Sequence, residues 1–425
     1  MTIKIDFKSH LENLKNQDQE VYNAVMGEIQ RQENTLELIP SENVVTSAVM
    51  ETQGSVLTNK YSEGYPGKRY YGGNQFIDKT ETLAIDRAKK LFRAEHANVQ
   101  PLSGAVMNIA TYFGVLETGD TILGMDLGHG GHLTHGHPIT HMAKVFNFVG
   151  YKTETDKDGI IDYDKLRAQA IECKPKLLLA GFSAYTKTLD WKKFKEIADE
   201  VGAMTMADVS HIGGLIAANV LENPLDHGFD FMTTTTHKTL RGPRGGLILC
   251  KEKYAKAIDK SVFPGLQGGP LEHVIAAKAV AFKEADSEEF VTYQKQVLKN
   301  AQGLAKGLME NGVTLVTNGT ENHMCLLDLR PQDLKGKIVE EVLDEVGICT
   351  NKNAIPDDTA SPLNPNGLRI GVPVITTRGL NETDCEVIGK LIADVINNIE
   401  DETTHKNVSE VVSEICKKYP LYTNE

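Results

Sequence analysis

Short apolar runs and helical segments alternate along the chain between about residues 78 and 285. The runs Thr121–Met125 and 176–182 are almost continuously apolar, as expected for strands buried on both faces of a sheet. Residues 190–201 carry apolar side chains at helical spacing and are followed by Gly202, a residue that commonly ends helices. This alternation predicts an α/β fold with a mainly parallel sheet.

The pattern changes on both sides of this region. Residues 1–50 are mostly polar with apolar positions at helical spacing, which predicts an N-terminal arm or helix. After residue 285, helical and strand-like segments mix without regular alternation. We therefore predict an N-terminal arm (1–50), a large α/β domain (51–285) and a small C-terminal α+β domain (286–425).

Composition and charge narrow the class of protein. The chain has 45 basic and 58 acidic side chains, a net charge of −13, which argues against a broad nucleic-acid-binding surface. Six scattered cysteines without a CxxC pair indicate reduced thiols, and the apolar runs are too short to span a membrane. The first ten residues lack the apolar core of a signal peptide. We expect a cytoplasmic enzyme without a membrane or nucleic-acid partner.

Residues 233–246 form the most unusual segment, in which four threonines precede His237, Lys238 and a turn rich in Gly, Pro and Arg. In open α/β sheets, ligands bind at the carboxyl ends of strands, where Lys238 is expected. Burial lowers the pKa of a lysine and favours the neutral amine that forms Schiff bases. Taken alone, such a lysine is more often a solvated residue of a surface turn.

Two other strand ends strengthen this interpretation. Asp208 follows an apolar strand and could pair with a protonated pyridine nitrogen, although such an Asp is also a common helix N-cap. Ser103 and Gly104 stand between a strand and a helix, where backbone N–H groups can hold a phosphate or where Ser simply caps the helix. Together, and in this order, the three features predict a pyridoxal-phosphate site.

Long segments of the chain resemble the serine hydroxymethyltransferase family. They are residues 38–43, 54–73, 130–136, 233–246, 263–270 and 351–356. The resemblance implies a fold type I architecture like that of aspartate aminotransferase, with a mainly parallel, seven-stranded type of sheet in the large domain. It also implies a homodimer with shared active sites, which doubles to a tetramer in some members.

The implied reaction is the reversible transfer of the hydroxymethyl group of L-serine to tetrahydrofolate, giving glycine and 5,10-methylenetetrahydrofolate with pyridoxal phosphate as cofactor. A folate-independent β-hydroxy amino acid aldolase and an α-methylserine hydroxymethyltransferase are the alternatives. A non-catalytic relative is disfavoured because Lys238, Asp208 and Arg369 are all present.

The resemblance also implies roles for individual residues. Residues assigned to catalysis are Lys238, Glu63, Tyr71, His132 and Thr235. Residues assigned to the cofactor are Lys238, Ser103, Gly104, Ala105, His132, Ser183, Asp208, His211, His237, Tyr61, Gly268 and Gly269. Residues assigned to the amino acid are Ser41, Tyr61, Glu63, Tyr71 and Arg369, and those assigned to folate are Leu127, Gly131, Leu133, Asn353 and Leu363.

Within these sets the resemblance implies specific contacts. Lys238 would form the Schiff base, Asp208 would pair with the pyridine nitrogen and His132 would stack on the ring. His211 would lie near the ring hydroxyl. Ser103, Gly104 and His237 would hold the phosphate, with Gly268 and Gly269 of the neighbouring subunit. Arg369 would bind the substrate carboxylate, and Glu63 would transfer protons at the serine hydroxyl and the folate.

Two features of the sequence limit the interpretation. Five histidines between residues 129 and 141 lack an HExxH spacing or a Cys partner, so we predict no metal site. Leu102 stands where the family often has His, and residues 363–366 replace a typical Phe-Val-Thr-Ser. Because the second segment lies near the expected folate pocket, the departures concern folate more than the cofactor.

Overall fold

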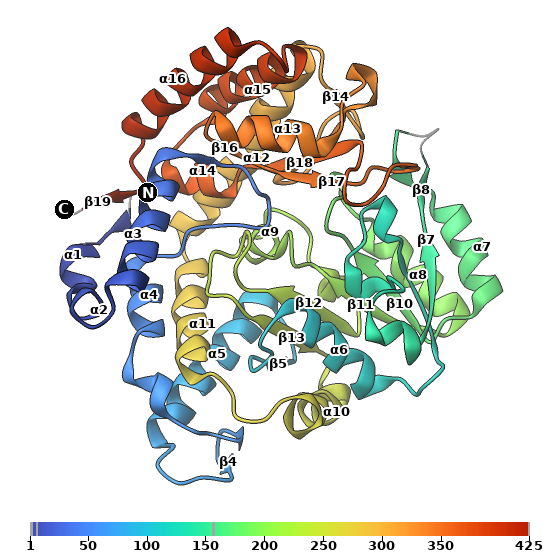
Figure 1. Ribbon diagram of the computed structural model, residues 1–425. Coiled ribbons are helices and arrows are strands. Elements are labelled where there is room, and N and C mark those ends of the chain that lie inside the picture. Colours follow the sequence, from blue (N-terminus) through green and yellow to red (C-terminus); the bar gives the residue numbers. More distant parts are fainter. Residues whose placement is uncertain (1–2, 6, 155–157, 424–425) are drawn as a thin grey trace. The chain divides into compact units, whose positions relative to one another are not determined.

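A computed structural model describes residues 3–5, 7–154 and 158–423 (Figure 1). The chain forms two compact units, a large unit of residues 48–295 and a small unit in which residues 1–47 join residues 296–425. The domain boundaries expected after residues 50 and 285 stay a prediction.

The large unit is built on a seven-stranded sheet with the order β5-β13-β12-β11-β10-β6-β7. Its strands are β5 (His96–Asn98), β6 (Thr121–Met125), β7 (Asn147–Tyr151), β10 (Leu177–Gly181), β11 (Met204–Asp208), β12 (Phe231–Thr235) and β13 (Gly246–Cys250). Strand β13 runs antiparallel to β12 and β5, and the other neighbouring strands are parallel. The predicted mainly parallel α/β sheet is confirmed.

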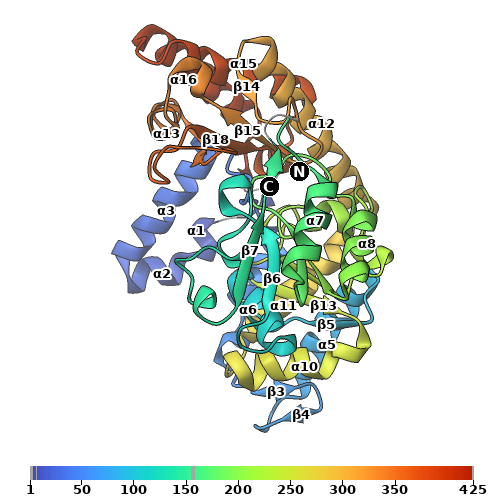
Figure 2. The same cartoon turned by 90° about the vertical axis from the view of Figure 1, so that its right-hand side faces the viewer.

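The large unit also contains helices, the first of which begins at Ser47, one residue before the unit. They are α4 (Ser47–Gln53), α5 (Gln75–Phe92), α6 (Gly104–Val115), α7 (Tyr163–Cys173), α8 (Trp191–Val201), α9 (Gly213–Ala217), α10 (Ala255–Lys260) and α11 (Glu272–Ala285). Helix α7 contacts β6 and β7, and α8 contacts β10 and β11; Figure 2 shows the two helices together on one side of β6 and β7. Helix α6 contacts β12 and β13, and α11 packs along α5.

Apolar side chains of the sheet and of α6 make the core of the large unit. Leu177, Leu179, Met206 and Phe231 are at most 1% exposed and pack with Tyr112 of α6. Burying a side chain of this size contributes about 1.5–3 kcal/mol. The core therefore fixes the strand ends that carry the candidate site residues.

The segment after α4 is irregular but held in place. It contains a small hairpin of β3 (Gly64–Tyr65) and β4 (Lys68–Arg69). The Arg69 guanidinium donates to the carbonyl oxygens of Ser62 at 2.9 Å and Gly64 at 3.0 Å and pairs with the Glu81 carboxylate at 2.5 Å. A second hairpin, β8 (Thr153–Glu154) with β9 (Ile160–Ile161), lies on either side of residues 155–157.

The small unit contains an antiparallel sheet with the order β14-β15-β18-β17. Its strands are β14 (Thr314–Leu315), β15 (Met324–Asp328), β17 (Asn351–Asn353) and β18 (Gly367–Gly371). Two further strand pairs are separate from this sheet: β1 (Ile3–Lys4) with β19 (Tyr422–Thr423), and β2 (Leu36–Glu37) with β16 (Ile348–Cys349). Its helices are α1 (Phe7–His10), α2 (Glu12–Gln17), α3 (Gln19–Asn34), α13 (Gly336–Glu345), α14 (Pro373–Arg378), α15 (Glu382–Asn397) and α16 (Glu402–Lys418). Helix α12 (Glu288–Glu310) includes the boundary between the units.

The buried Arg378 side chain joins the N-terminal residues to the C-terminal part of the small unit. Its guanidinium donates to the carbonyl oxygens of Thr35 at 2.8 Å, Tyr419 at 2.6 Å and Cys416 at 3.2 Å. These bonds explain why residues 1–47 belong with residues 296–425. Within the described parts of the chain, no helix combines the length and apolar character needed to cross a membrane.

Candidate active site

Lys238 lies in the connection between β12 and β13, at the carboxyl end of β12, and is 9% exposed. The connection is fixed by backbone hydrogen bonds from Thr236 N to the Gly245 carbonyl at 3.1 Å and from Gly242 N to the Thr236 carbonyl at 2.7 Å. The Thr239 hydroxyl donates to the His211 carbonyl at 2.9 Å. The amine of Lys238 is therefore carried by a well-held loop.

Asp208 ends the neighbouring parallel strand β11, where it pairs in register with Thr233 of β12. Its buried carboxylate accepts four hydrogen bonds, from Asn108 Nδ2 at 2.8 Å, His135 Nε2 at 3.1 Å, Ser210 N at 3.1 Å and Ser210 Oγ at 2.6 Å. Burial would raise the pKa of Asp208, but the hydrogen bond from His135, with contributions from His132 and Ser210, holds it well below its usual range. Asp208 is not a helix N-cap, because α9 begins at Gly213 after Ile212.

Asn108 was not predicted from the sequence, yet it links several site residues. It lies one turn after Gly104 on α6 and is fully buried. The Asn108 Nδ2 group donates to Thr134 Oγ1 at 2.9 Å as well as to the Asp208 carboxylate. Its Oδ1 accepts from the Thr233 hydroxyl at 2.8 Å. The one-turn spacing from Gly104 was the available signal, because both residues face the same side of the helix.

His135 ends a single turn of 3₁₀ helix (Leu133–His135), and His132 is its N-cap. His135 Nδ1 accepts from the His132 backbone N–H at 3.2 Å, so the proton of a neutral His135 ring lies on Nε2, which faces the Asp208 carboxylate. His132 Nδ1 lies 2.8 Å from Thr134 Oγ1 and accepts from Thr134 N at 3.2 Å. Both rings are thus oriented by their own turn, and the role of His135 was missed by sequence reasoning.

Ser103, Gly104 and Ala105 form the start of α6. Ser103 is the N-cap, and its hydroxyl accepts from Val106 N at 3.4 Å. The N–H groups of Gly104 and Ala105 belong to the first turn, where a helix supplies no partner of its own. A Cβ at Gly104 would lie 2.8 Å from Thr235 Cγ2, so this corner packs directly against the end of β12. Ala105 contributes a backbone N–H but no side-chain donor.

His237 precedes the candidate lysine, and its Nδ1 accepts from Gly245 N at 3.5 Å. Burial and, to a smaller extent, the charges of Arg244, Lys238 and Lys278 together lower the pKa of His237 to about 3. Thr235, at the end of β12, is 5% exposed, and its hydroxyl faces the Ser210 carbonyl at 3.5 Å. His211 is 2% exposed beside the same loop.

A second group of predicted residues gathers around the irregular segment after α4. The Tyr61 hydroxyl donates to Glu63 Oε1 at 3.2 Å, and the rings of Tyr61 and Tyr71 meet edge to face at 5.0 Å. A Cβ at Gly269 would lie 3.0 Å from the Tyr61 ring, and one at Gly268 would lie 3.3 Å from Glu63 Oε1. These five residues therefore come together within one chain.

The remaining predicted residues divide between the units. In the large unit, Ser183 N donates to the Gly130 carbonyl at 2.7 Å, which places Ser183 beside the turn that carries Gly131. Leu133 is 46% exposed, and Leu127 is half-buried. Ser41, Asn353, Leu363 and Arg369 belong to the small unit.

Arg369 lies on β18, where it is 9% exposed. Its Nε and Nη2 donate to Asn351 Oδ1 at 3.3 and 3.2 Å. Burial lowers the pKa of Arg369 to about 10, so the guanidinium remains charged at neutral pH. Leu363, in contrast, is 80% exposed.

The family model described as "Serine hydroxymethyltransferase" matches residues 14–392. The chain belongs to the serine hydroxymethyltransferase family. Its members are pyridoxal-phosphate-dependent one-carbon transferases of fold type I that act on serine and glycine, with tetrahydrofolate as co-substrate. The predicted family, fold class, enzyme class and cofactors are confirmed.

The residues of the large unit fit the cofactor of this family. An ionised, buried carboxylate at Asp208 suits a protonated pyridine nitrogen. The start of α6 offers unpaired backbone N–H groups and a helix dipole for a phosphate. Glycine is favoured at position 104, because a Cβ would lie 2.8 Å from Thr235 Cγ2 and force one of the two to shift. The roles assigned to the individual residues stay predictions.

His132, His135 and Asp208 each offer a ligand atom, and these atoms lie within 4.8 Å of one another. A metal ion could use such a group. However, both oxygens of the Asp208 carboxylate already accept hydrogen bonds from Asn108 and Ser210. The absence of a metal site stays a prediction.

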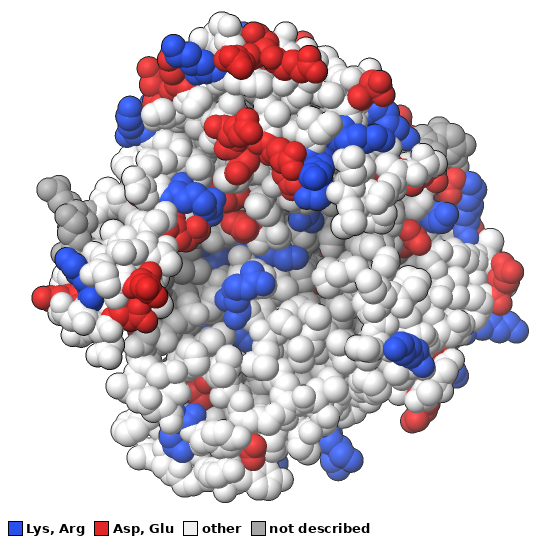
Figure 3. Space-filling model, viewed as in Figure 1, with Lys and Arg blue, Asp and Glu red and all other residues white. Residues whose placement is uncertain are grey.

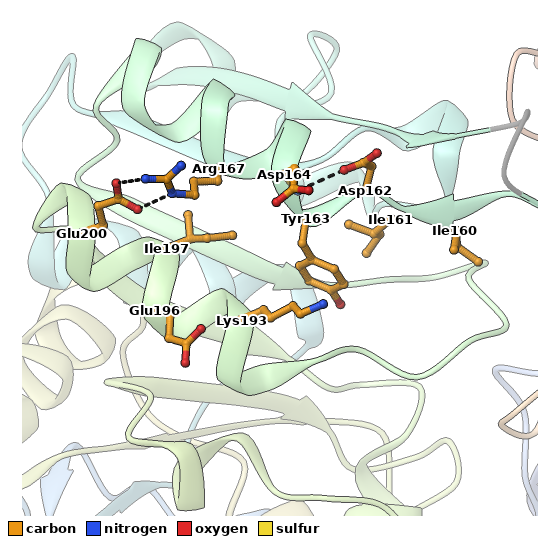
Figure 4. Close-up of a pocket in the computed structure, with 10 residues that line it drawn as sticks. All are labelled: Ile160, Ile161, Asp162, Tyr163, Asp164, Arg167, Lys193, Glu196, Ile197 and Glu200. Atoms are coloured by element: carbon orange, nitrogen blue, oxygen red, sulfur yellow. Dashed lines mark hydrogen bonds and ion pairs between the residues drawn. The ribbon is translucent and has the colours of Figure 1, made fainter.

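A groove of about 610 Å³ between α7 and α8 lies apart from these residues (Figure 4). Several of the polar groups that line it already have partners. The Arg167 guanidinium binds both oxygens of the Glu200 carboxylate at 2.5 and 2.6 Å, and the Tyr163 hydroxyl accepts from Asp190 N at 2.8 Å. The groove therefore gives no indication of a second active site.

The depressed pKa of His237 predicts a pH dependence of stability. Because the folded chain holds His237 neutral down to about pH 3, whereas an unfolded His titrates near 6.5, the unfolded state binds more protons between these values and stability falls as the pH drops. His237→Gln should flatten this fall by up to about 1.4 kcal/mol per pH unit. Urea unfolding of the cofactor-free chain from pH 7 to 4 measures the effect.

The exposed His10 provides the control, because His10→Gln should leave the profile of the parent protein unchanged. Identical profiles for His237→Gln and the parent chain would contradict a buried neutral His237.

Proposed function

We propose that this chain catalyses the reversible transfer of the hydroxymethyl group of L-serine to tetrahydrofolate, giving glycine and 5,10-methylenetetrahydrofolate. Membership of the serine hydroxymethyltransferase family supports the reaction class. The observation that carries the proposal is that the amine of Lys238 and the ionised carboxylate of Asp208 stand at the carboxyl ends of adjacent parallel strands. Such a pair suits a cofactor that needs an amine at one end and an acid partner at its ring nitrogen.

In this proposal Lys238 holds pyridoxal phosphate through its amine, and Ser103, Gly104 and His237 hold the phosphate. Bound there, the cofactor supplies an electron sink for negative charge at Cα of the amino acid. Asp208 keeps a proton on the ring nitrogen, because its own low pKa prevents it from taking that proton back. His132 would cover the ring, in the orientation that Thr134 imposes.

Arg369 is the proposed partner of the substrate carboxylate, together with Ser41. A guanidinium binds a carboxylate through two parallel hydrogen bonds, which a lysine cannot match. The contacts to Asn351 Oδ1 use Nε and Nη2 of Arg369 and so hold the guanidinium in a fixed plane. A charged group that is 9% exposed is strongly attracted to an incoming anion.

Glu63 is the proposed carrier of the proton at the serine hydroxyl oxygen. The Tyr61 hydroxyl donates to its carboxylate and orients it, and the Tyr71 ring packs against Tyr61. A positioned carboxylate of this kind typically accelerates a proton transfer by about 10²–10⁴-fold. For folate we propose the residues Leu127, Gly131, Leu133, Asn353 and Leu363, of which Leu133 and Leu363 expose alkyl side chains.

A homodimer is the proposed assembly. Five large apolar or aromatic side chains between residues 56 and 76 are exposed, namely Val56 (78%), Tyr61, Tyr70 (75%), Tyr71 and Phe76 (64%). Figure 3 shows few charged side chains on the lower part of the visible face, where Figure 1 draws this segment. Such a density of exposed apolar groups is typical of an interface. The six free cysteines are in keeping with the cytoplasm as the proposed compartment.

Folate dependence is the decisive property of the proposed reaction. With L-serine and tetrahydrofolate, the purified protein should form glycine and methylenetetrahydrofolate in equal amounts. Without folate the one-carbon unit can leave only as free formaldehyde, so the rate should fall by roughly a hundredfold or more. Glycine formed equally fast without folate would identify an aldolase, and a preference for α-methylserine would identify the other alternative.

Arg369→Lys should weaken serine binding and leave the cofactor in place. Loss of the bidentate contact to a buried carboxylate costs roughly 2–3 kcal/mol, so KM for serine should rise by roughly 30–150-fold. Steady-state kinetics and the bound pyridoxal phosphate per chain measure the two effects. Arg330→Lys, at a half-exposed pair with Asp328, is the control. Unchanged serine affinity in Arg369→Lys would rule out the assigned role.

Charge placed on the segment 56–76 should disrupt the dimer. We expect the parent protein to sediment as two chains and Val56→Arg combined with Tyr70→Arg to sediment as one, with reduced activity. Ile171→Arg, on an exposed position of α7, should remain a dimer. A monomeric, fully active parent protein would refute the assembly.

A further inference from the structure

Lys278 is a lysine in the middle of α11 that is only 1% exposed. A buried ammonium is costly unless its hydrogens are all bonded. Its Nζ donates to three backbone carbonyl oxygens, those of Val99 at 2.7 Å, Gly246 at 2.8 Å and Pro101 at 3.1 Å. These three bonds use every hydrogen of the ammonium.

The three carbonyls belong to the two chain segments that form the proposed phosphate site. Val99 and Pro101 lie between β5 and Ser103, the N-cap of α6. Gly246 begins β13 and ends the loop that carries His237 and Lys238. The Pro101 carbonyl also accepts from Gly246 N at 2.9 Å. One ammonium therefore joins the segment leading to the phosphate cradle with the end of the lysine loop.

Two glycines make this junction tight. A Cβ at Gly245 would lie 2.5 Å from Lys278 Cε and 2.9 Å from Nζ, so the ammonium lies directly against the loop. A Cβ at Gly246 would lie 2.7 Å from the Ser103 carbonyl oxygen. Gly245 also donates to His237 Nδ1. A shift of the Lys278 ammonium would thus be transmitted to both Ser103 and His237.

The charge of Lys278 also affects the residues around the proposed phosphate site. Burial lowers the pKa of Lys278 to about 7, and the Glu81 carboxylate opposes this shift. The three carbonyl acceptors favour the charged ammonium, because a neutral amine has only two hydrogens. Glu81 accepts from Gln100 Nε2 at 2.7 Å, and Gln100 lies between Val99 and Pro101. The ammonium also helps to lower the pKa of His237. Its field therefore reaches a side chain assigned to the phosphate.

We propose that Lys278 is a positioning residue for the cofactor phosphate. It holds the start of α6 against the loop of His237 and Lys238, and it places a positive charge behind both. The residue acts through backbone carbonyls and touches neither substrate nor reacting atoms. The inference rests on the proposed function, because it requires a phosphate at Ser103 and Gly104.

Lys278→Met tests the inference by removing the ammonium while keeping a side chain of similar length. Equilibrium dialysis of the full-length protein against pyridoxal phosphate, and separately against pyridoxal, gives Kd for ligands with and without the phosphate. For Lys278→Met, Kd for pyridoxal phosphate should rise roughly tenfold or more, and Kd for pyridoxal by less than about twofold. Lys283→Met, at an exposed position of the same helix, should change neither value.

Gly245→Ala provides a second variant that retains the lysine but pushes its end away from the loop. It should also raise Kd for pyridoxal phosphate, by a smaller factor than Lys278→Met. If Lys278→Met does not fold, this variant tests the inference instead. Unchanged affinity for pyridoxal phosphate in the folded variants would overturn the inference, as would equal losses for both ligands. Failure of the proposed function would look different, because the parent protein itself would not prefer pyridoxal phosphate to pyridoxal.

Discussion

The Asp208 carboxylate, kept ionised inside the large unit, is the interaction on which the rest of the site depends. Removing an unpaired carboxylate from water costs several kcal/mol, so donors must reach both of its oxygens. They come from α6, from the 3₁₀ turn of His132 and His135, and from the turn after β11. Satisfying one buried charge therefore brings together the helix of the phosphate cradle, the candidate ring-covering histidine and the end of the sheet.

Local sequence patterns were sufficient to predict the strand ends of the site. Asp208 ends an apolar run, Lys238 follows a strand that ends in a run of threonines, and the sheet places the two strands side by side. The partners of these residues were not predictable in the same way, because Asn108 lies 100 positions from Asp208, and Lys278 lies 179 positions from Val99. Apolar spacing identifies a buried face but does not say which distant polar group will meet it.

The same distinction applies to the fold. Continuous apolar runs such as β6 and β10 were predictable because these strands are buried by helices that follow nearby in the chain. The grouping of residues 1–47 with residues 296–425 was not, because it depends on hydrogen bonds from Arg378 to carbonyl oxygens of Thr35 and Tyr419. Backbone acceptors are present at every position, so no sequence motif marks those that a distant guanidinium will use.

The large sequence separation between Lys278 and its carbonyl partners has a consequence for folding during translation. Its carbonyl partners Val99 and Pro101 are translated almost 180 residues earlier than Lys278 itself. Domains generally fold as units once their sequence has left the ribosome, and contacts between distant segments form late. The nascent chain thus exposes Ser103, Asp208 and Lys238 before the ammonium that joins their loops exists. On this account, tight binding of the cofactor requires that α11 has left the ribosome. A chain truncated before this helix would contain Ser103, Asp208 and Lys238 but would lack the ammonium that joins their loops.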